Sequence, residues 1–355
     1  MALASAGTIG LDIGTSAVRA ARVGASKGGY SLGAFGQVAL PAGAVSDGEI
    51  REPEAVSEAI AELWKRARLR SKKAIIGVAN QRVVVRPVDL PYMDEKDFRD
   101  SLRFQVADHI PMPVDAAQLD FQVLDDYVAD NDQHMMRVLL VAAATEMIES
   151  FVGVTSAAGV TPVGVDLGPL AAARAVSPAA RDELGVAGAE AVVDVGAGVT
   201  NVIVHHNGEP RFVRILLLGG DDPTAALAGH LGISFEEAEA LKLDLGRGVG
   251  SAESQRVLRE RVTKLVEEIR GSLDYYSSQE DSEPIAGVIV TGGGSLTPGL
   301  VTQLEDTLHM QVRTATPLAD LDVSKSGLTD EQVSQIEPVI ATAVGLATGS
   351  QSRSR

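Results

Sequence analysis

One short pattern occurs twice in this 355-residue chain, once near the start and once in the second half. LDIGTSAVRAARV and VDVGAGVTNVIVH both have an apolar run, an Asp, an apolar residue, a Gly, two small residues and a second strand-like run. An internal duplication of strand, acidic turn and strand predicts two similar domains that face each other. Two such turns can lie on either side of one ligand.

The chemistry of the turns indicates an anion site with a metal ion beside it. A glycine turn lets backbone N–H groups approach phosphate oxygens closely, and the carboxylate can hold a hydrated Mg²⁺ ion. In this interpretation Asp12 and Asp194 are metal-proximal, and the hydroxyls of Thr15 and Ser16 donate to phosphate. Taken alone, either turn would be interpreted as an ordinary turn in which Asp bonds local backbone. The paired occurrence favours the ligand site.

A third segment supports a nucleotide as the ligand. GVIVTGGGSLTPGL is a buried strand that runs into three glycines and then a helix. Gly292, Gly293 and Gly294 leave bare backbone against which a flat nucleoside can lie. On its own, this run is equally typical of a flexible turn.

Composition excludes several classes of protein. The chain has 48 acidic and 31 basic residues, and its net charge of −17 repels nucleic acid and anionic lipid alike. It has no Cys, so thiolate metal sites and Cys nucleophiles are excluded. MALASAG lacks the features of a signal peptide, and no apolar run approaches the roughly 20 residues that span a bilayer. We expect a cytoplasmic protein with no nucleic-acid partner and no direct membrane insertion.

The order of strand-like and helical segments is typical of an α/β fold, and the length predicts two domains. Within the first half, 86–160 has the pattern of a small α+β unit of βαββα order, with a helix at 94–110. The predicted organisation is a first domain at 1–185 and 335–349 that contains this inserted unit, a second domain at 186–334, and a polar tail at 350–355.

These motifs, together with the small-residue helix PVIATAVGLATG, resemble the actin, sugar kinase and heat-shock chaperone superfamily of ATP-binding proteins. Within it, FQVADHIPMPVDAAQLDFQVL, GGDDPTAALAGHLGISFEEAEALK and EIRGSLDYY resemble the PilM family, cytoplasmic actin-like proteins of type IV pilus assembly. The resemblance covers nearly the whole chain. It implies an actin-like (ribonuclease H-like) duplicated fold that holds Mg-ATP between its two domains.

The resemblance assigns further residues to this site. It places Gly14 in the first phosphate loop with Asp12, and Arg19 where actin has a phosphate-facing Lys. It adds a second phosphate loop with Asp194, Gly196, Gly198 and Thr200. It also adds a pair of glycines near the phosphates and ribose, Gly219 and Gly220, and an E-x-x-K pair near the adenosine, Glu239 and Lys242. The E-x-x-K pair also fits an ordinary solvated ion pair at i, i+3.

Two departures from the superfamily pattern predict slow hydrolysis. Ala197 stands where actin has a second acidic residue, and Gly168 where the heat-shock chaperones have a Glu. General acid–base assistance to the attacking water is worth about 10²- to 10⁴-fold in rate. We therefore expect at most a slow ATPase, with no catalytic residue assigned.

The resemblance also implies a partner. PilM-like proteins are recruited to the cytoplasmic face of the inner membrane by PilN, a bitopic protein whose cytoplasmic N-terminal peptide lies in a groove between the first domain and its inserted unit. Phe104 and Ile110 are candidates to line such a groove, and packing in the core explains them equally well. The resemblance leaves self-association open, and it does not identify the pilus or type II-like secretion system served.

Two other functions use the same phosphate loops. A small-molecule kinase needs a catalytic base near the γ-phosphate, and the first domain offers no convincing Asp beyond the loops. An FtsA-like division protein forms filaments and normally ends in an amphipathic anchoring helix, whereas this sequence ends in GSQSRSR. Of the three, the sequence favours an ATP-responsive scaffold of pilus assembly.

Overall fold

Two β-sheets with matching strand order form the centre of the fold, which a computed structural model describes for residues 7–26, 29–177 and 188–352. Each sheet has an antiparallel three-stranded meander followed by two parallel strands. In the first sheet these are β3 (Gly29–Ala39), β2 (Ala17–Ser26), β1 (Thr8–Ile13), β6 (Lys73–Val78) and β10 (Thr161–Leu167). In the second they are β13 (Glu209–Leu216), β12 (Thr200–His206), β11 (Ala189–Val195), β14 (Ile285–Thr291) and β15 (Val312–Thr314).

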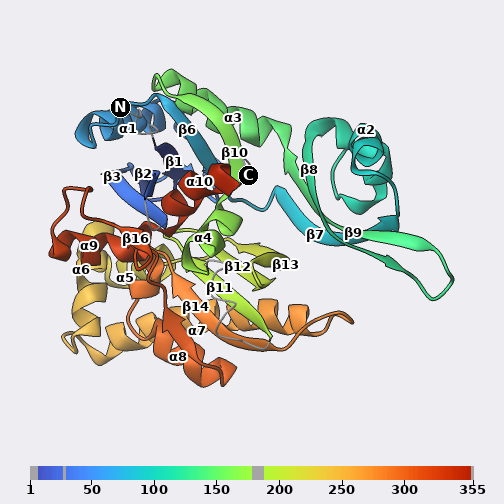
Figure 1. Cartoon of the computed structure of the whole chain (residues 1–355). Coiled ribbons are helices and arrows are strands. Elements are labelled where there is room, and N and C mark those ends of the chain that lie inside the picture. Colours follow the sequence, from blue (N-terminus) through green and yellow to red (C-terminus); the bar gives the residue numbers. More distant parts are fainter. Residues whose placement is uncertain (1–6, 27–28, 178–187, 353–355) are drawn as a thin grey trace.

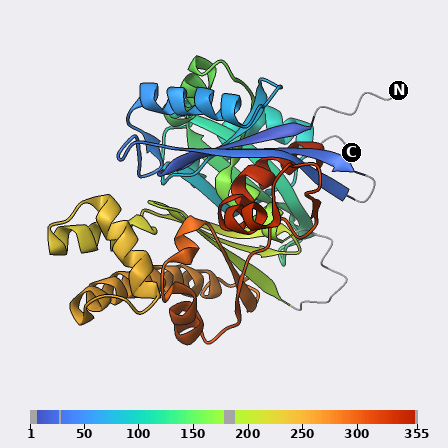
Figure 2. The same cartoon turned by 90° about the vertical axis from the view of Figure 1, so that its left-hand side faces the viewer.

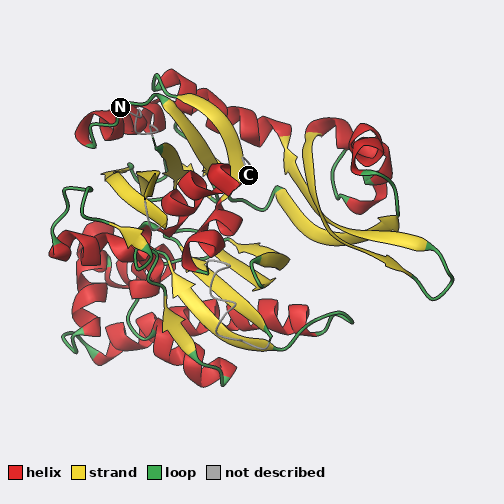
Figure 3. Ribbon diagram, in the orientation of Figure 1, coloured by secondary structure: helices red, strands yellow, loops and turns green. Residues whose placement is uncertain are grey.

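The predicted duplication is therefore present, and helices cover both sheets (Figure 3). On the first sheet they are α1 (Pro53–Arg66), α3 (Thr145–Ala157), α4 (Gly168–Val176) and α10 (Ala341–Ser352). On the second they are α5 (Asp221–Leu231), α6 (Phe235–Gly246), α7 (Ala252–Ser277) and α8 (Leu300–Leu308). In Figure 2 the first domain (blue) lies above the second (yellow and orange), with α10 (red) between them.

Apolar side chains at helical spacing attach these helices to their sheets. In α1, Val56, Ile60 and Leu63 are fully buried against the first sheet, and α1 starts with a Pro at its first position, as helices prefer. In α7, Val262 and Ile269 lie in the separate core of the second domain. Each sheet thus has a core of its own, and a further apolar cluster packs Ala173 and Val176 of α4 against Val192 of the second sheet.

A small third unit projects from the first domain (Figure 1). Its strands β7 (Val83–Pro91), β9 (His134–Ala144) and β8 (Ala117–Val128) form an antiparallel sheet covered by α2 (Glu95–Gln105). The unit has its own core, in which the rings of Phe98 and Phe121 meet edge to face at 4.6 Å. We call residues 83–144 the inserted unit.

The boundary of the inserted unit differs from the expected range of 86–160. Helix α3 follows β9 directly, but its side chains Met147 and Phe151 pack in the core of the first domain. The helix expected at 94–110 is also shorter, because α2 ends at Gln105 and a separate 3-10 turn follows at Ala107–His109. The inserted unit therefore ends at β9.

The chain returns to the first domain earlier than the expected residue 335. Strand β16 (Leu321–Asp322) pairs with β3 at the edge of the first sheet, and Leu318 packs with α10 against that sheet. A short helix, α9 (Asp330–Ile336), leads from there to α10. Helix α10 continues into the tail expected at 350–355, of which 353–355 lie outside the described residues.

One ion-pair network joins the inserted unit to the second domain. Arg137 on β9 donates to both carboxylate oxygens of Asp89 on β7, at 2.8 and 2.9 Å, and to Asp281 in the segment after α7, at 2.7 Å. The inserted unit is thus covalently attached to one domain and ion-paired to the other. None of the helices in the described ranges has the length and hydropathy needed to cross a membrane.

Candidate functional site

A cavity of about 390 Å³ lies between the two domains, within the range of about 300–1000 Å³ that is typical of ligand sites. Most of the residues expected to bind nucleotide or metal line it: Asp12, Gly14, Thr15, Ser16, Arg19, Asp194, Gly196, Gly220, Glu239, Lys242, Gly292, Gly293 and Gly294. The two halves of the chain therefore converge on one site.

The two Asp-Gly turns have the same local structure. The backbone N–H of Gly14 donates to Ala17 at 3.1 Å, and that of Gly196 donates to Val199 at 2.8 Å. The turns face each other closely, because a Cβ on Gly198 would lie 3.1 Å from the side chain of Thr15. Gly198 therefore forms a contact between the two Asp-Gly turns and is not part of the cavity wall.

The aspartates have equivalent partners in the two copies. Asp12 is opposite Arg19 in the β1–β2 register, and Asp194 is opposite Asn201 in the β11–β12 register. The Arg19 guanidinium lies 3.7 Å from Asp12, and the Asn201 amide donates to Asp194 at 3.2 Å. Register alone thus brings a polar side chain to each carboxylate.

Both carboxylates resist ionisation in the unliganded site. Burial raises the pKa of Asp12, and the charge and hydrogen bond of Arg19 oppose this effect. Burial raises the pKa of Asp194 to about 6; the Asn201 hydrogen bond lowers it, and the nearby Asp12 charge adds to the increase. The two groups therefore form a site that a cation would stabilise.

The residues present fit a hydrated Mg²⁺ ion. Among the described residues, no group of three or more His, Cys, Asp or Glu residues could hold a metal by itself. Mg²⁺ commonly binds through one or two carboxylates, several waters and substrate phosphates. Three buried polar atoms around the aspartates also have no protein partner: Arg19 Nε, Asn201 Oδ1 and Thr291 Oγ1. Buried polar groups are normally satisfied, so these atoms suit a polar ligand or its waters.

Glycines make the cradle around this site. Gly292 has φ +86°, and a Cβ there would lie 2.2 Å from the carbonyl oxygen of Val195 and 2.6 Å from Asp194 Oδ1. A Cβ on Gly219 would lie 2.2 Å from the carbonyl oxygen of Ala197. The Gly220 N–H donates to Gly196 at 2.9 Å. The three glycine turns therefore pack backbone to backbone, and Gly219 supports the cradle from behind.

Thr200 also supports the second loop from outside the cavity. It is fully buried, and its hydroxyl donates to the carbonyl oxygen of Leu218 at 2.7 Å. This bond ties the start of β12 to the segment that leads into the Gly219 turn. Thr200 thus fixes the loop and does not reach the cavity.

Lys242 is buried, so the simple surface ion-pair interpretation does not apply to it. Its Nζ donates to the carbonyl oxygen of Gly220 at 2.8 Å and to Thr224 at 2.9 Å, and it lies 2.7 Å from Glu239. Its three protons thus have three protein acceptors. Glu239, with 41% of its side chain exposed, also accepts from Thr224. Lys242 therefore holds the Gly220 turn and Glu239 in place.

Several further lining residues were not expected from the sequence, among them Asn201, Phe235 and Asp221. Asn201 could have been found from its register opposite Asp194, and Phe235 lies one helical turn before Glu239 on α6. Asp221 starts α5 on the cavity wall; burial raises its pKa, and the Lys242 charge opposes the increase. No sequence pattern distinguishes Asp221 from an ordinary acidic residue in a first helical turn.

The two candidate partner-binding residues lie in different surroundings. Phe104 on α2 is 84% exposed, an unusual position for an aromatic side chain. Ile110 is 9% exposed and packs in the core of the inserted unit. Of the pair, Phe104 is the accessible side chain.

A family model described as type IV pilus assembly protein PilM matches residues 10–351. The chain belongs to this family. A solved structure titled PilM-PilN type IV pilus biogenesis complex superimposes with a TM-score of 0.84 at 29% identity, over 96% of this chain and 98% of that chain. The predicted family and actin-like fold are thus confirmed.

More distant relatives share the fold. FtsA of Pseudomonas aeruginosa is 26% identical over 95% of this chain and 88% of its own length. FtsA of Bacillus subtilis is 27% identical, and there the match spans 44% of the relative's length. The structure of MreB5 of Spiroplasma citri bound to ADP has a TM-score of 0.54 at 13% identity, over 98% of this chain and 99% of that chain. These relatives place the PilM family among actin-like proteins.

The raised pKa of Asp194 predicts pH-dependent stability of the nucleotide-free protein. Its pKa is about 6 when folded and near 3.8 when unfolded, so its stabilising contribution is complete below about pH 4 and is lost as pH rises through 6. Asp194→Asn keeps the group neutral. We expect this variant to match wild type at pH 4 and to exceed its free energy of unfolding by about 1–2 kcal/mol at pH 7.5, after allowance for partial exposure.

Urea unfolding at several pH values measures this difference. Asp306→Asn, which neutralises an exposed carboxylate on α8, is the matched control and should follow wild type throughout. Parallel pH curves for Asp194→Asn and wild type would contradict the prediction.

Proposed function

We propose that this protein binds Mg-ATP between its two domains and acts as an ATP-responsive scaffold in the inner-membrane platform of a type IV pilus or a related secretion system. The observation that carries the proposal is the pairing of Asp12 with Asp194 across a cavity whose walls are backbone at glycine turns. In such a site two carboxylates suit a hydrated cation, and bare N–H groups suit phosphate oxygens.

Each part of the nucleotide has a matching wall. The aspartates would hold the hydrated ion, and the turns at Gly14 and Gly196 would bind the phosphates. Glu239, held by Lys242, would accept from the ribose, and Gly293 would lie against the nucleoside. When bound, Mg²⁺ would neutralise phosphate charge.

Slow turnover follows from what the cavity lacks at two positions. Gly168 and Ala197 both line it, and neither can orient or deprotonate a water. Among the described lining residues, Asp12 is the acidic residue from the first domain, and it is paired with Arg19. This arrangement supports nucleotide retention over both rapid hydrolysis and small-molecule phosphorylation.

The proposed partner is the cytoplasmic peptide of a PilN-like bitopic membrane protein. Support comes from the solved complex of PilM with PilN, which is 29% identical to this chain. The exposed Phe104 offers an apolar anchor on the inserted unit, and the net charge of −17 favours a peptide that carries Lys or Arg. Such a partner would recruit this cytoplasmic protein to the inner membrane.

An FtsA-like role in cell division is the second candidate, because FtsA sequences match most of the chain. The PilM family model and the PilM-PilN structure both match nearly the whole chain. The TM-score of that structure is 0.84, against 0.54 for the structure of MreB5. These observations favour pilus assembly.

Mg-ATP is expected to raise the melting temperature of the wild-type protein. A ligand that binds only the native state adds about 2.7 kcal/mol at a hundredfold excess over Kd. Asp12→Ala and Asp194→Asn should lose most of this increase. Since Asp194→Asn is expected to be more stable without nucleotide, its loss of response cannot be attributed to unfolding. An unchanged wild-type melting temperature would contradict the nucleotide assignment.

Hydrolysis by the isolated protein is expected to be slow, well below the median enzyme rate of about 10 s⁻¹. Phosphate release should be measured for wild type and for Asp194→Asn, which provides the background from contaminating enzymes. A rapid ATPase in wild type that Asp194→Asn abolishes would show that another residue activates the water.

Phe104→Ala is expected to weaken binding of a synthetic N-terminal peptide from the PilN-like protein by about tenfold or more, because buried aromatic anchors dominate such interfaces. Leu296→Ala is the matched control, since Leu296 is also an exposed apolar residue, 60% exposed in the second domain. Calorimetric titration measures both affinities. Equal affinity of the two variants would place the peptide site elsewhere.

A further inference from the structure

A short hairpin connects the nucleotide cavity to the base of the inserted unit. Its strands are β4 (Val45–Ser46) and β5 (Glu49–Ile50), and Val45 and Gly48 line the cavity. Gly48 has φ +70°, and a Cβ there would lie 2.3 Å from the carbonyl oxygen of Ala79. The turn is therefore packed directly on the segment that leads from β6 into the inserted unit.

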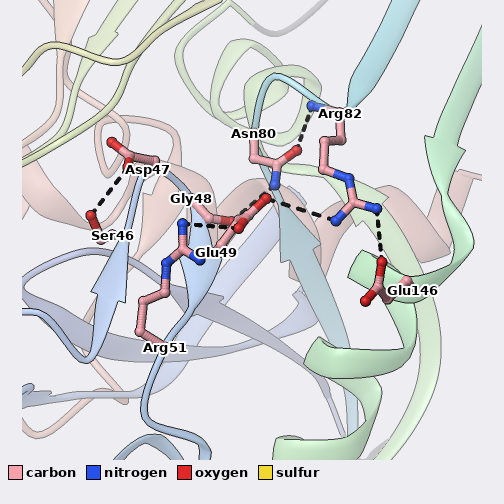
Figure 4. Close-up of polar contacts among 8 residues, drawn as sticks. All are labelled: Ser46, Asp47, Gly48, Glu49, Arg51, Asn80, Arg82 and Glu146. Atoms are coloured by element: carbon pink, nitrogen blue, oxygen red, sulfur yellow. Dashed lines mark hydrogen bonds and ion pairs between the residues drawn. The ribbon is translucent and has the colours of Figure 1, made fainter. Parts of the chain in front are cut away.

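Asn80 bonds to both the cavity turn and the entry to the inserted unit (Figure 4). It is 1% exposed; its amide donates to the carbonyl oxygen of Gly48 at 3.4 Å, and its side-chain oxygen accepts from the Arg82 N–H at 2.6 Å. A displacement of Gly48 thus acts on Arg82 through a single buried side chain.

Arg82 joins the two chain segments that attach the inserted unit. Its guanidinium contacts Glu146 at 3.1 Å, in the first turn of α3, and lies 3.8 Å from Glu49 on β5 (Figure 4). Its carbonyl oxygen accepts from Ala144, the last residue of β9, at 3.2 Å. The entry before β7 and the exit after β9 are therefore held together beside the hairpin.

The inserted unit has a core of its own, but at the base of β7 and β9 the side chains of Val83, Ala143 and Ala144 pack in the core of the first domain. A change in the orientation of the unit therefore bends the chain at this base. On the side that faces the second domain, Arg137 of the unit contacts Asp281. A change in the relative position of the two domains can therefore move the unit through the contact between Arg137 and Asp281. The β4–β5 hairpin can move it through the contacts of Arg82.

We propose that Arg82 is a positioning residue that couples the nucleotide in the cavity to the orientation of the inserted unit, and through it to the partner surface that includes Phe104. This inference rests on the proposed nucleotide function. Coupling between two binding sites is reciprocal, so nucleotide and partner peptide change each other's affinity by the same factor. Since the Arg82 ion pairs are partly exposed, salt weakens the coupling.

The absence of Cys from the chain allows the orientation to be measured with introduced labels. The unit pair, Glu58→Cys on α1 with Asp130→Cys in the β8–β9 turn, reports the distance between the first domain and the inserted unit. The closure pair, Glu58→Cys with Glu267→Cys on α7, reports the distance between the two domains. All three residues are exposed. Single-molecule energy transfer gives both distances. In wild type we expect Mg-ATP to change both.

Variants at Arg82 distinguish coupling from folding. In Arg82→Gln the closure pair should still respond to Mg-ATP, and the melting temperature should still rise, while the unit pair should not respond. Arg82→Lys should respond partially, because an ammonium cannot span Glu49 and Glu146 as the guanidinium does. Arg86→Gln removes an exposed charge from β7, the strand that Arg82 precedes, and should behave as wild type.

The peptide titration provides a second measurement. In wild type, saturating Mg-ATP should change peptide affinity by about fivefold or more, and the factor should fall toward one in Arg82→Gln or at about 0.5 M salt. Arg86→Gln should retain the wild-type factor.

Four results would overturn the proposal in distinguishable ways. If Mg-ATP changes neither melting temperature nor distances in wild type, the nucleotide function itself fails, and the coupling fails with it. If the melting temperature rises but the unit pair stays fixed in wild type, only the coupling fails. A full unit-pair response in Arg82→Gln, or its equal loss in Arg86→Gln, would exclude a specific role for Arg82.

Discussion

Two carboxylates held close together at the ends of buried strands impose the central constraint on this structure. Asp12 and Asp194 are both partly desolvated, and the negative charge of Asp12 adds to the cost of ionising Asp194. Arg19 and Asn201 reduce this cost without removing it. The free protein therefore carries unfavourable electrostatic energy that a bound cation would relieve. Each sheet contributes one carboxylate, so a cation can contact both carboxylates only when the two domains lie at a suitable distance from each other.

The duplicated meander could be predicted because its signal is local. The Asp-Gly pattern specifies strand, turn and strand, and once the meander is assumed, antiparallel register places Arg19 opposite Asp12. The inserted unit's end could not be predicted in the same way. Met147 and Phe151 make α3 amphipathic whichever core it joins, and only tertiary packing assigns it to the first domain. Helical periodicity identifies an apolar face but not the surface that covers it.

Lys242 and Phe104 illustrate the same limit at the level of single residues. A Lys three positions after a Glu on a helix is normally exposed, yet this one is enclosed by acceptors from α5 and the Gly220 turn. A Phe on a helix is normally at least partly buried, yet this one faces solvent. In both cases segments distant in sequence determine the environment. The surroundings of these two residues could therefore not be predicted from the sequence.

The glycine cradle has a consequence for how such a protein can change over evolutionary time. Its surface is largely main chain, which every residue supplies, and the turns can pack this closely because Gly219 and Gly292 have no Cβ. Selection on the site therefore acts on what is absent from a few positions, and the side chains elsewhere are free to drift as long as the two sheets still pack. The relatives match nearly the whole chain at only 26–29% identity.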